Sequence, residues 1–377
     1  MTSILLCPDK FKGSLTASEV CAALARGLLS DGHPFNIMHH PMADGGDGSL
    51  QVLLTHLDLR PHTVATIDPL GRAVKATYYT DDEVAYIELA AASGLVFLDE
   101  HERDAQATST LGTGTLIAEA IAQGYSRVHL FLGGSATNDG GMGIANALGV
   151  RFLNGIGQML EPCGKTLQDI ERIDLSGIPE SVRQTEFAVL VDVMNPLCGP
   201  YGAAESYARQ KGATEAVVKQ LDAGLHNLAN RIDEATGARV AALPGGGAAG
   251  GVAAGLAGLF GARIEKGFDY FARATGLDER LVDADAVVSG EGQLDATSLQ
   301  GKVVGGVGRR CEAAQKPFHL VAGAAAIAPR NLEILNPASI HTVLEHAAGL
   351  EDAMQNAEQY VEDIGRRLAE LLKASTA

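Results

Sequence analysis

The pattern that most constrains the fold is the alternation of short apolar strands with amphipathic helices at both ends of the chain. Residues 4–7 form a predicted strand, a helix follows Thr16, and residues 35–39 form a second strand. Thr16 is a predicted N-cap, because Glu19 completes a capping box. This alternation is typical of a doubly wound parallel sheet. The alternation returns near the end of the chain. Residues 286–289, 318–323 and 340–344 are predicted strands, and residues 303–314 are a predicted helix.

The middle of the chain follows a different pattern. Residues 73–79 and 83–89 alternate apolar and polar side chains around a short polar turn, which predicts an antiparallel hairpin in another sheet. A chain of 377 residues is also longer than one core usually organises. We therefore predict an α/β protein with a discontinuous Rossmann-like parallel-sheet domain, residues 1–65 and 283–377. Residues 66–282 are expected to form an inserted second α/β domain with a mixed sheet.

Composition excludes several classes of protein. The net charge of -17 argues against a nucleic-acid partner, which would require a basic face. The five cysteines are scattered, odd in number and without a CxxC pair, so free thiols are expected, and the absence of HExxH spacing argues against a zinc site. The start of the chain lacks a signal-peptide core, and no apolar stretch approaches the roughly 20 residues of a membrane span. We expect a cytoplasmic protein without a membrane partner.

Five segments combine glycine with hydroxyl or acidic residues just after a predicted strand. Ligands of open α/β sheets bind where the carboxyl ends of the strands meet the following helices, and glycine N–H groups there can hold an anion. Five such segments in one chain favour a ligand site over ordinary tight turns. The Walker P-loop and the protein-kinase signatures are both absent. The segments are residues 8–14, 43–48, 133–141, 245–251 and 289–295.

Acidic and basic residues in these segments suit phosphoryl transfer, which needs carboxylates to hold Mg²⁺ and cations to neutralise phosphate charge. For any single acid, the alternative is an Asx turn or a helix cap. Asp192 is better placed, because it ends an apolar strand. The acids are Asp44, Asp47, Asp139, Asp192, Glu291 and Asp295, and the nearest lysines are Lys10, Lys12, Lys211 and Lys302.

A dinucleotide site is the main alternative. Gly245, Gly247 and Gly250 match GxGxxG, and Glu265 lies near the distance expected for a ribose ligand, which would indicate an NAD(P)-dependent hydroxy-acid dehydrogenase. Pro244 leaves a poor strand before these glycines, so the match is weak.

Taken together, these motifs resemble the type I glycerate kinases. The matching segments keep the family's order over nearly the full length of the chain. One departure is Asp47-Gly48-Ser49, where members often carry Glu-Gly-Thr; aspartate keeps the charge and shortens the reach. The matches are residues 8–14, 43–48, 132–141, 192–197, 210–213, 245–251 and 290–295, with Gly301 and Lys302.

The resemblance implies phosphorylation of D-glycerate by ATP with Mg²⁺, mainly at the 2-hydroxyl to give 2-phosphoglycerate. The residues themselves leave a glycerate 3-kinase open. They also leave the oligomeric state open, with a homodimer as one alternative.

Roles for individual residues follow as hypotheses. Asp192 is expected to accept the proton of the substrate hydroxyl, with glycerate in the cleft between the domains. Lys10 and Lys12 would neutralise developing charge. An alternative gives Asp192 to the metal and the base role to Asp295. The expected metal ligands are Asp44, Asp295 and Glu291; the expected substrate and nucleotide contacts are Gly133, Gly134, Ser135, Thr137, Asn138, Asp139, Asn195, Lys211, Gly246, Gly247 and Lys302.

Overall fold

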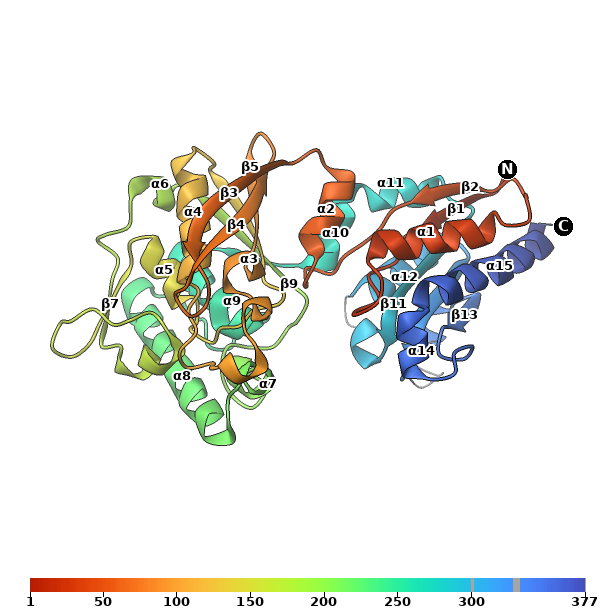
Figure 1. Ribbon diagram of the computed structural model, residues 1–377. Helices are drawn as coiled ribbons and strands as arrows, with labels where there is room; N and C mark the ends of the chain where they lie inside the picture. Colours follow the sequence, from red (N-terminus) through yellow and green to blue (C-terminus); the bar gives the residue numbers. More distant parts are fainter. Residues whose placement is uncertain (300–301, 328–332, 377) are drawn as a thin grey trace. The chain divides into compact units, whose positions relative to one another are not determined.

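A computed structural model describes residues 1–299, 302–327 and 333–376, and the contacts divide the chain into two compact units (Figure 1). Unit 1 contains Met1–Asp44, Gln51–Leu57 and Gly267–Ala377, and unit 2 contains Gly45–Leu50 and Asp58–Lys266. The unit limits differ from the domain limits expected from the sequence. The expected limit at residue 65 falls inside a strand of unit 2. The expected limit at residue 282 falls at the end of a helix that belongs to unit 1.

Unit 1 is built on a five-stranded sheet in the order β13-β12-β11-β1-β2, in which every neighbouring pair is parallel. This confirms the predicted Rossmann-like parallel sheet. The glycine-rich segment of residues 289–295 is not a loop throughout. Strand β11 continues through Glu291, which pairs with Ala322 on the neighbouring strand. The strands are β1 (Ser3–Leu6), β2 (Asn36–His39), β11 (Ala286–Leu294), β12 (Phe318–Ala325) and β13 (Ser339–Thr342).

Helices cover this sheet. The Thr16–Glu19 capping box is present at the start of α1. Gly27 of α1 lies so close to the backbone of α15 at Glu362 that a Cβ would collide with it, and Figure 1 shows these two helices side by side. The helices of unit 1 are α1 (Ala17–Leu28), α2 (Ser49–His56, whose first two residues belong to unit 2), α10 (Gly267–Thr275), α11 (Leu277–Val282), α12 (Val303–Ala313), α14 (Leu350–Gln355) and α15 (Ala357–Thr376), with short 3-10 turns at Ala296–Leu299 and Glu333–Leu335.

The core of unit 1 follows from the alternation of side chains along its strands. Ile4, Leu6 and Val288 pack with the apolar faces of α1 and α15. Leu5 and Val287 alternate with them, are also fully buried, and therefore lie on the opposite face of the sheet. Near the C-terminus, α14 and α15 are separate helices that meet at Asn356.

Unit 2 is built on a mixed six-stranded sheet in the order β10-β9-β6-β5-β4-β3. The expected hairpin is confirmed, because β4 pairs antiparallel with both β5 and β3. The other neighbours, β5 with β6, β6 with β9 and β9 with β10, are parallel. The strands are β3 (Arg60–Ile67), β4 (Ala73–Thr80), β5 (Val84–Glu88), β6 (Arg127–Phe131), β9 (Glu186–Val191) and β10 (Arg263–Lys266), and a separate two-stranded ribbon contains β7 (Arg151–Leu153) and β8 (Arg172–Asp174).

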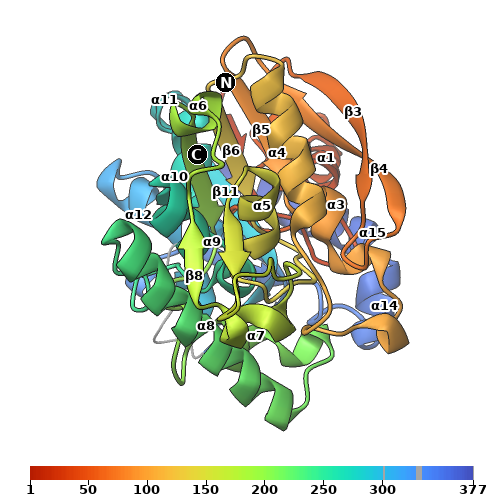
Figure 2. The ribbon, with the colours of Figure 1, turned by 90° about the vertical axis from the view of Figure 1, so that its left-hand side faces the viewer.

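The helices of unit 2 enclose one large apolar core. In Figures 1 and 2, α4 lies along the sheet beside β3, β4 and β5, and α5 packs against α4. The long helix α8 begins at the N-cap Thr214 and buries one apolar stripe. The helices are α3 (Ala90–Ser93), α4 (Leu111–Ala122), α5 (Met142–Ala147), α6 (Glu180–Arg183), α7 (Ala203–Tyr207), α8 (Glu215–Thr236) and α9 (Ala248–Phe260), with 3-10 turns at Leu95–Phe97, Glu100–Glu102, Gly164–Asp169 and Arg209–Lys211.

All five cysteines are buried and free. Within the described residues, no helix has the length and apolar character needed to cross a membrane.

Candidate active site

Three carboxylates converge at the carboxyl edge of the parallel sheet in unit 1. Asp9 follows β1 and Asp44 follows β2, whereas Glu291 lies within β11. The segment after β1 continues along β11, since the backbone N–H of Asp9 donates to the carbonyl of Gly290 at 2.8 Å. Neighbouring parallel strands end at the same edge, so side chains far apart in sequence meet there.

Burial sets the electrostatics of this carboxylate cluster, defined as Asp9, Asp44 and Glu291. All three residues are less than a tenth exposed. Burial, reinforced by the charge of Asp44, raises the pKa of Asp9 to about 7 against the opposing charge of Lys10. Burial also raises the pKa of Glu291 to about 7, against a hydrogen bond from Ser298. Crowded carboxylates of this kind are relieved by a cation.

The chemistry of the cluster fits a hard divalent cation. Oxygen donors are the ligands that Mg²⁺ takes in proteins. Oε1 of Glu291 is buried and has no hydrogen-bond partner in the described part of the chain. An oxygen without a partner at a cluster of like charges is available to a metal ion.

The other expected residues of unit 1 surround this cluster. Asp295 is half-buried, its backbone N–H bonds the Ser298 hydroxyl at 2.9 Å, and its charge acts on Glu291. Lys302 is the N-cap residue of α12, and its charge also acts on Glu291; Gly301 lies outside the described residues. Lys10 is half-buried beside Asp9, whose carboxylate accepts from the Lys10 backbone N–H at 2.7 Å. Lys12 is exposed.

Asp9 is not among the metal ligands expected from the sequence. The signal was present, because Asp9 comes three residues after the end of β1, at the edge where Asp44 was already expected.

In unit 2, the glycine-rich loop of residues 133–141 connects β6 to α5. Gly133 lies directly against the backbone of Gly46 and Asp47, where a Cβ would collide with the Asp47 nitrogen. Gly134 has φ +70°, a left-handed conformation that favours glycine. The loop is thus folded tightly against residues 46 and 47.

Lys211 anchors this loop from inside the unit. It is only 2% exposed, and its Nζ donates to the Ser135 hydroxyl at 2.8 Å and to the carbonyl of Thr137 at 2.7 Å. Burial lowers the pKa of Lys211 to about 7, although the charge of Asp139 opposes this shift. A buried lysine of this kind holds the loop in one conformation.

Two polar side chains of the loop have no hydrogen-bond partner among the described residues. Asn138 is fully buried, yet both its amide oxygen and its amide nitrogen are without hydrogen bonds to the described residues. The same is true of the Thr137 hydroxyl. Buried polar atoms are rarely left unpaired, and orphaned ones indicate a ligand or a water. Amide and hydroxyl donors fit the phosphate oxygens of ATP or the oxygens of an organic acid.

Asp139 is occupied by the fold. Its carboxylate accepts hydrogen bonds from the backbone and hydroxyl of Thr110 at 2.8 and 2.7 Å, and from the N–H groups of Gly141 and Gly143 at 3.1 and 3.2 Å. Burial raises the pKa of Asp139 despite these four donors. This arrangement makes Asp139 an organiser of the loop.

Asp192 is exposed and follows β9, at the same sheet edge as the loop after β6. Burial, assisted by the charge of Asp192, raises the pKa of Tyr207 to about 12. The Tyr207 hydroxyl donates to Oδ1 of Asn195 at 2.7 Å, and Nδ2 of Asn195 donates to the carbonyl of Tyr201 at 2.8 Å. Asn195 therefore holds the segment after β9 in place.

Gly246 and Gly247 lie before α9. A dinucleotide fingerprint would require a strand directly before these glycines, and the preceding residues form none. Gly247 packs against the carbonyl of Pro196, and Gly250 against Thr137. Close packing of loops accounts for these glycines and argues against the dehydrogenase alternative.

Gly133→Ala is expected to destabilise the protein by about 1–3 kcal/mol, because the added Cβ must displace the backbone at Asp47. Chemical denaturation measures this change, and kcat should fall as the loop shifts. Gly349→Ala, at a glycine with open space around it, is the matched control and should keep the wild-type stability. Equal stability of Gly133→Ala and wild type would contradict the tight packing of this loop.

Comparison with known proteins identifies the class. A model of the glycerate kinase family matches residues 4–373. A glycerate kinase of Halalkalibacterium halodurans is 37% identical, over 98% of each chain. The glycerate 2-kinase of Escherichia coli is 33% identical, over 98% of this chain and 97% of its own. A crystal structure of a protein assigned as glycerate kinase 2 from Salmonella typhimurium LT2 is 35% identical, with a TM-score of 0.83 and coverage of 100% and 99% of the two chains.

The chain is thus a small-molecule kinase, consistent with the carboxylates and lysines of unit 1 and the polar donors of the unit 2 loop. It belongs to the glycerate kinase family. Membership of a kinase family implies the use of ATP.

Proposed function

We propose that this enzyme phosphorylates the 2-hydroxyl of D-glycerate with ATP and Mg²⁺, giving 2-phosphoglycerate. The observation that carries the proposal is the alignment over nearly the full length of both chains with the glycerate 2-kinase of Escherichia coli. Other relatives are named glycerate kinase without a stated product, so 3-phosphoglycerate is the competing outcome.

Mg²⁺ would be held by Asp44, Glu291 and Asp295, with Asp9 as an additional ligand. Support comes from the burial of Asp9, Asp44 and Glu291 and from the orphaned Oε1 of Glu291. When bound, Mg²⁺ supplies charge neutralisation on the phosphates of ATP. Lys10, Lys12 and Lys302 would add to this neutralisation from the same unit.

The loop of residues 133–141 would bind anionic oxygens of the substrate or of ATP. Its donors are the N–H groups of Gly133 and Gly134 and the side chains of Ser135, Thr137 and Asn138. Lys211 and Asp139 act as positioning residues, since their polar atoms already bond the loop. Three expected site residues would keep the adjoining segments packed instead of contacting a ligand through a side chain. The amide of Asn195 is already hydrogen-bonded, and Gly246 and Gly247 have no side chain and pack closely against neighbouring loops.

Asp192 would accept the proton of the attacking hydroxyl. An exposed carboxylate at a strand end is accessible to substrate and rigidly placed. The alternative assigns this role to Asp295. The cytoplasmic location and the homodimer considered from the sequence stay predictions.

The reaction is tested by incubating the purified protein with ATP, Mg²⁺ and D-glycerate and identifying the product by ³¹P NMR. 2-Phosphoglycerate would support the proposal in full. 3-Phosphoglycerate would keep the kinase and refute the choice of hydroxyl, and absence of glycerate-dependent ADP release would refute the substrate.

Asp44→Asn is expected to lower kcat/KM by at least about 10²-fold, because one charged ligand of the metal is lost. Mg²⁺ should raise the Tm of the wild type and raise that of the variant much less. Without Mg²⁺, the variant should be at least as stable as the wild type, since the Asp44 charge disfavours ionised Asp9.

Asp283→Asn, an exposed aspartate of the same unit, provides the matched control and should keep the full response to Mg²⁺. An Asp44→Asn protein with the wild-type Mg²⁺ response would remove Asp44 from the metal site.

A further inference from the structure

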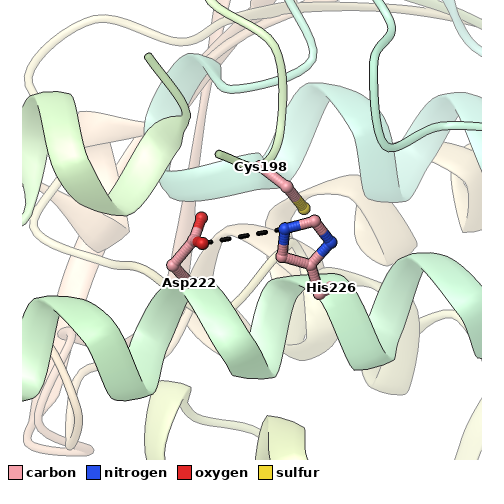
Figure 3. Close-up of side chains that lie close together, drawn as sticks. All are labelled: Cys198, Asp222 and His226. Atoms are coloured by element: carbon pink, nitrogen blue, oxygen red, sulfur yellow. Dashed lines mark ion pairs between the residues drawn. The ribbon is translucent and has the colours of Figure 1, made fainter. Parts of the chain in front are cut away.

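A second group of ligating side chains lies in unit 2. Cys198 comes from the segment after β9, and Asp222 and His226 lie one turn apart on α8 (Figure 3). One ligand atom of each residue, the sulfur, a carboxylate oxygen and an imidazole nitrogen, lies within 4.8 Å of the other two. In the described part of the chain, it is the one group of three or more histidine, cysteine and acidic side chains whose ligand atoms lie this close together.

The spacing is close to that of a tetrahedral zinc site. Zinc ligands lie about 2.0–2.3 Å from the metal, which places neighbouring ligand atoms roughly 3.3–3.7 Å apart. Oδ2 of Asp222 and Nε2 of His226 are 3.7 Å apart, already at this separation. Figure 3 shows the Cys198 sulfur directed toward the imidazole, so small side-chain rotations would complete the three-ligand set.

The surrounding structure orients these ligands. Oδ1 of Asp222 accepts the backbone N–H of Gly199 at 2.9 Å, which leaves Oδ2 directed at His226. The backbone N–H of Cys198 donates to the carbonyl of Ala241 at 3.3 Å. Outer hydrogen bonds of this type fix the first-shell ligands of metal sites.

Burial differs across the group in a way that suits metal entry. Cys198 is 8% exposed, whereas the His226 side chain is 54% exposed. The sulfur is thereby protected on the protein side, and the imidazole side is open to solvent for the metal and for a fourth ligand.

The donor types separate this group from the carboxylate cluster of unit 1. Sulfur and imidazole nitrogen select zinc and similar transition metals, whereas Mg²⁺ prefers oxygen alone. We propose that Cys198, Asp222 and His226 form a transition-metal site of the zinc class, with a fourth position open to water, which fastens the segment after β9 to α8. The proposal is independent of the substrate of the enzyme.

Co²⁺ provides the direct test, because it replaces Zn²⁺ and reports its ligands in its absorption spectrum. With excess Mg²⁺ present to fill the carboxylate cluster of unit 1, the full-length protein, first stripped of metal, should bind one Co²⁺ per chain with a thiolate-to-cobalt charge-transfer band and the strong visible bands of tetrahedral cobalt. Zn²⁺ should displace the cobalt, and excess Mg²⁺ should not. Zn²⁺ should also raise the Tm.

Cys198→Ser and His226→Gln should each remove the charge-transfer band or lower the affinity for Co²⁺ by at least about tenfold. Tenfold is a lower limit, because the loss of a residue that only hydrogen-bonds to a metal ligand already lowers metal affinity by that much. His226 is exposed, so its variant should fold normally even if Cys198→Ser does not. Matched controls are Cys163→Ser, another buried cysteine of unit 2, and His101→Gln, an exposed histidine.

The proposal is overturned if wild-type protein gives no thiolate band, if the band survives in Cys198→Ser, or if His226→Gln leaves both the band and the Co²⁺ affinity unchanged. Equal loss in the two control variants would overturn it as well. None of these readouts requires glycerate turnover, so they stand apart from the test of the kinase reaction.

Discussion

Asp192→Asn is expected to lower kcat by about 10²–10⁴-fold, the usual contribution of a general base, with little change in the free energy of unfolding. The amide has nearly the shape of the carboxylate but cannot accept the hydroxyl proton. Asp192 is exposed at the end of β9, so the substitution leaves the core intact. Steady-state kinetics at saturating ATP and glycerate measure the effect.

Two comparisons make the Asp192 result specific. Asp233→Asn, on the exposed side of α8, changes the same charge and should keep wild-type kcat. Asp295→Asn tests the alternative base. If Asp295→Asn loses the pH-dependent limb of kcat and Asp192→Asn keeps nearly full activity, the base is Asp295.

The parts of the fold set by local signals were predictable from the sequence. The capping box of Thr16 and Glu19 marks the start of α1, and the alternation on both sides of a short turn marks the β4–β5 hairpin. Both depend on residues a few positions apart. The break between α14 and α15 has no such local signal, because the apolar spacing continues across Asn356 although the helix does not.

Long-range packing accounts for what the sequence did not show. The glycines at positions 290 and 292 favoured a loop, yet β11 continues through them, since Gly290 packs tightly against the carbonyl of Val321 on the neighbouring strand. That extension places Glu291 in a strand beside the segment of Asp9. Pattern alone could not supply the strand order that brings these acids together.

The candidate site in unit 2 shows the same limit. The glycine loop and Lys211 were recognisable as motifs, but not the burial of Lys211 or the saturation of Asp139 by four donors. Cys198, Asp222 and His226 have no recognisable metal-site spacing in the sequence. They meet only because the segment after β9 passes over α8.

Lys211 connects the structure of the loop to pH. The pKa of Lys211 is about 7 in the folded protein and about 10.4 in an unfolded chain. Between these values the unfolded state binds more protons, so the free energy of unfolding should rise with pH. Above about pH 8.5, cysteines ionise in the unfolded chain, whereas burial raises the pKa of Cys21 to about 12 in the folded one, which opposes the rise. Near pH 7, Asp9 and Glu291 also oppose the rise, because their pKa values of about 7 in the folded protein lie above those of the unfolded chain. The Lys211 contribution is therefore measured as the difference between the wild type and a variant without this lysine over pH 7–8.5.

Lys211→Met should remove the Lys211 contribution to this pH dependence, which reaches up to about 1.4 kcal/mol per pH unit, and should lower kcat by about 10²-fold. The kinetic loss is expected because Ser135 and Thr137 lose the ammonium that holds them, and a shift of about 1 Å in a positioning loop has an effect of that size. Urea denaturation at several pH values measures the slope. Lys219→Met, an exposed lysine on α8, should keep both the slope and kcat. A Lys211→Met protein that retains the wild-type slope would show that Lys211 is not the group that titrates, and retained kcat would show that the loop does not depend on it.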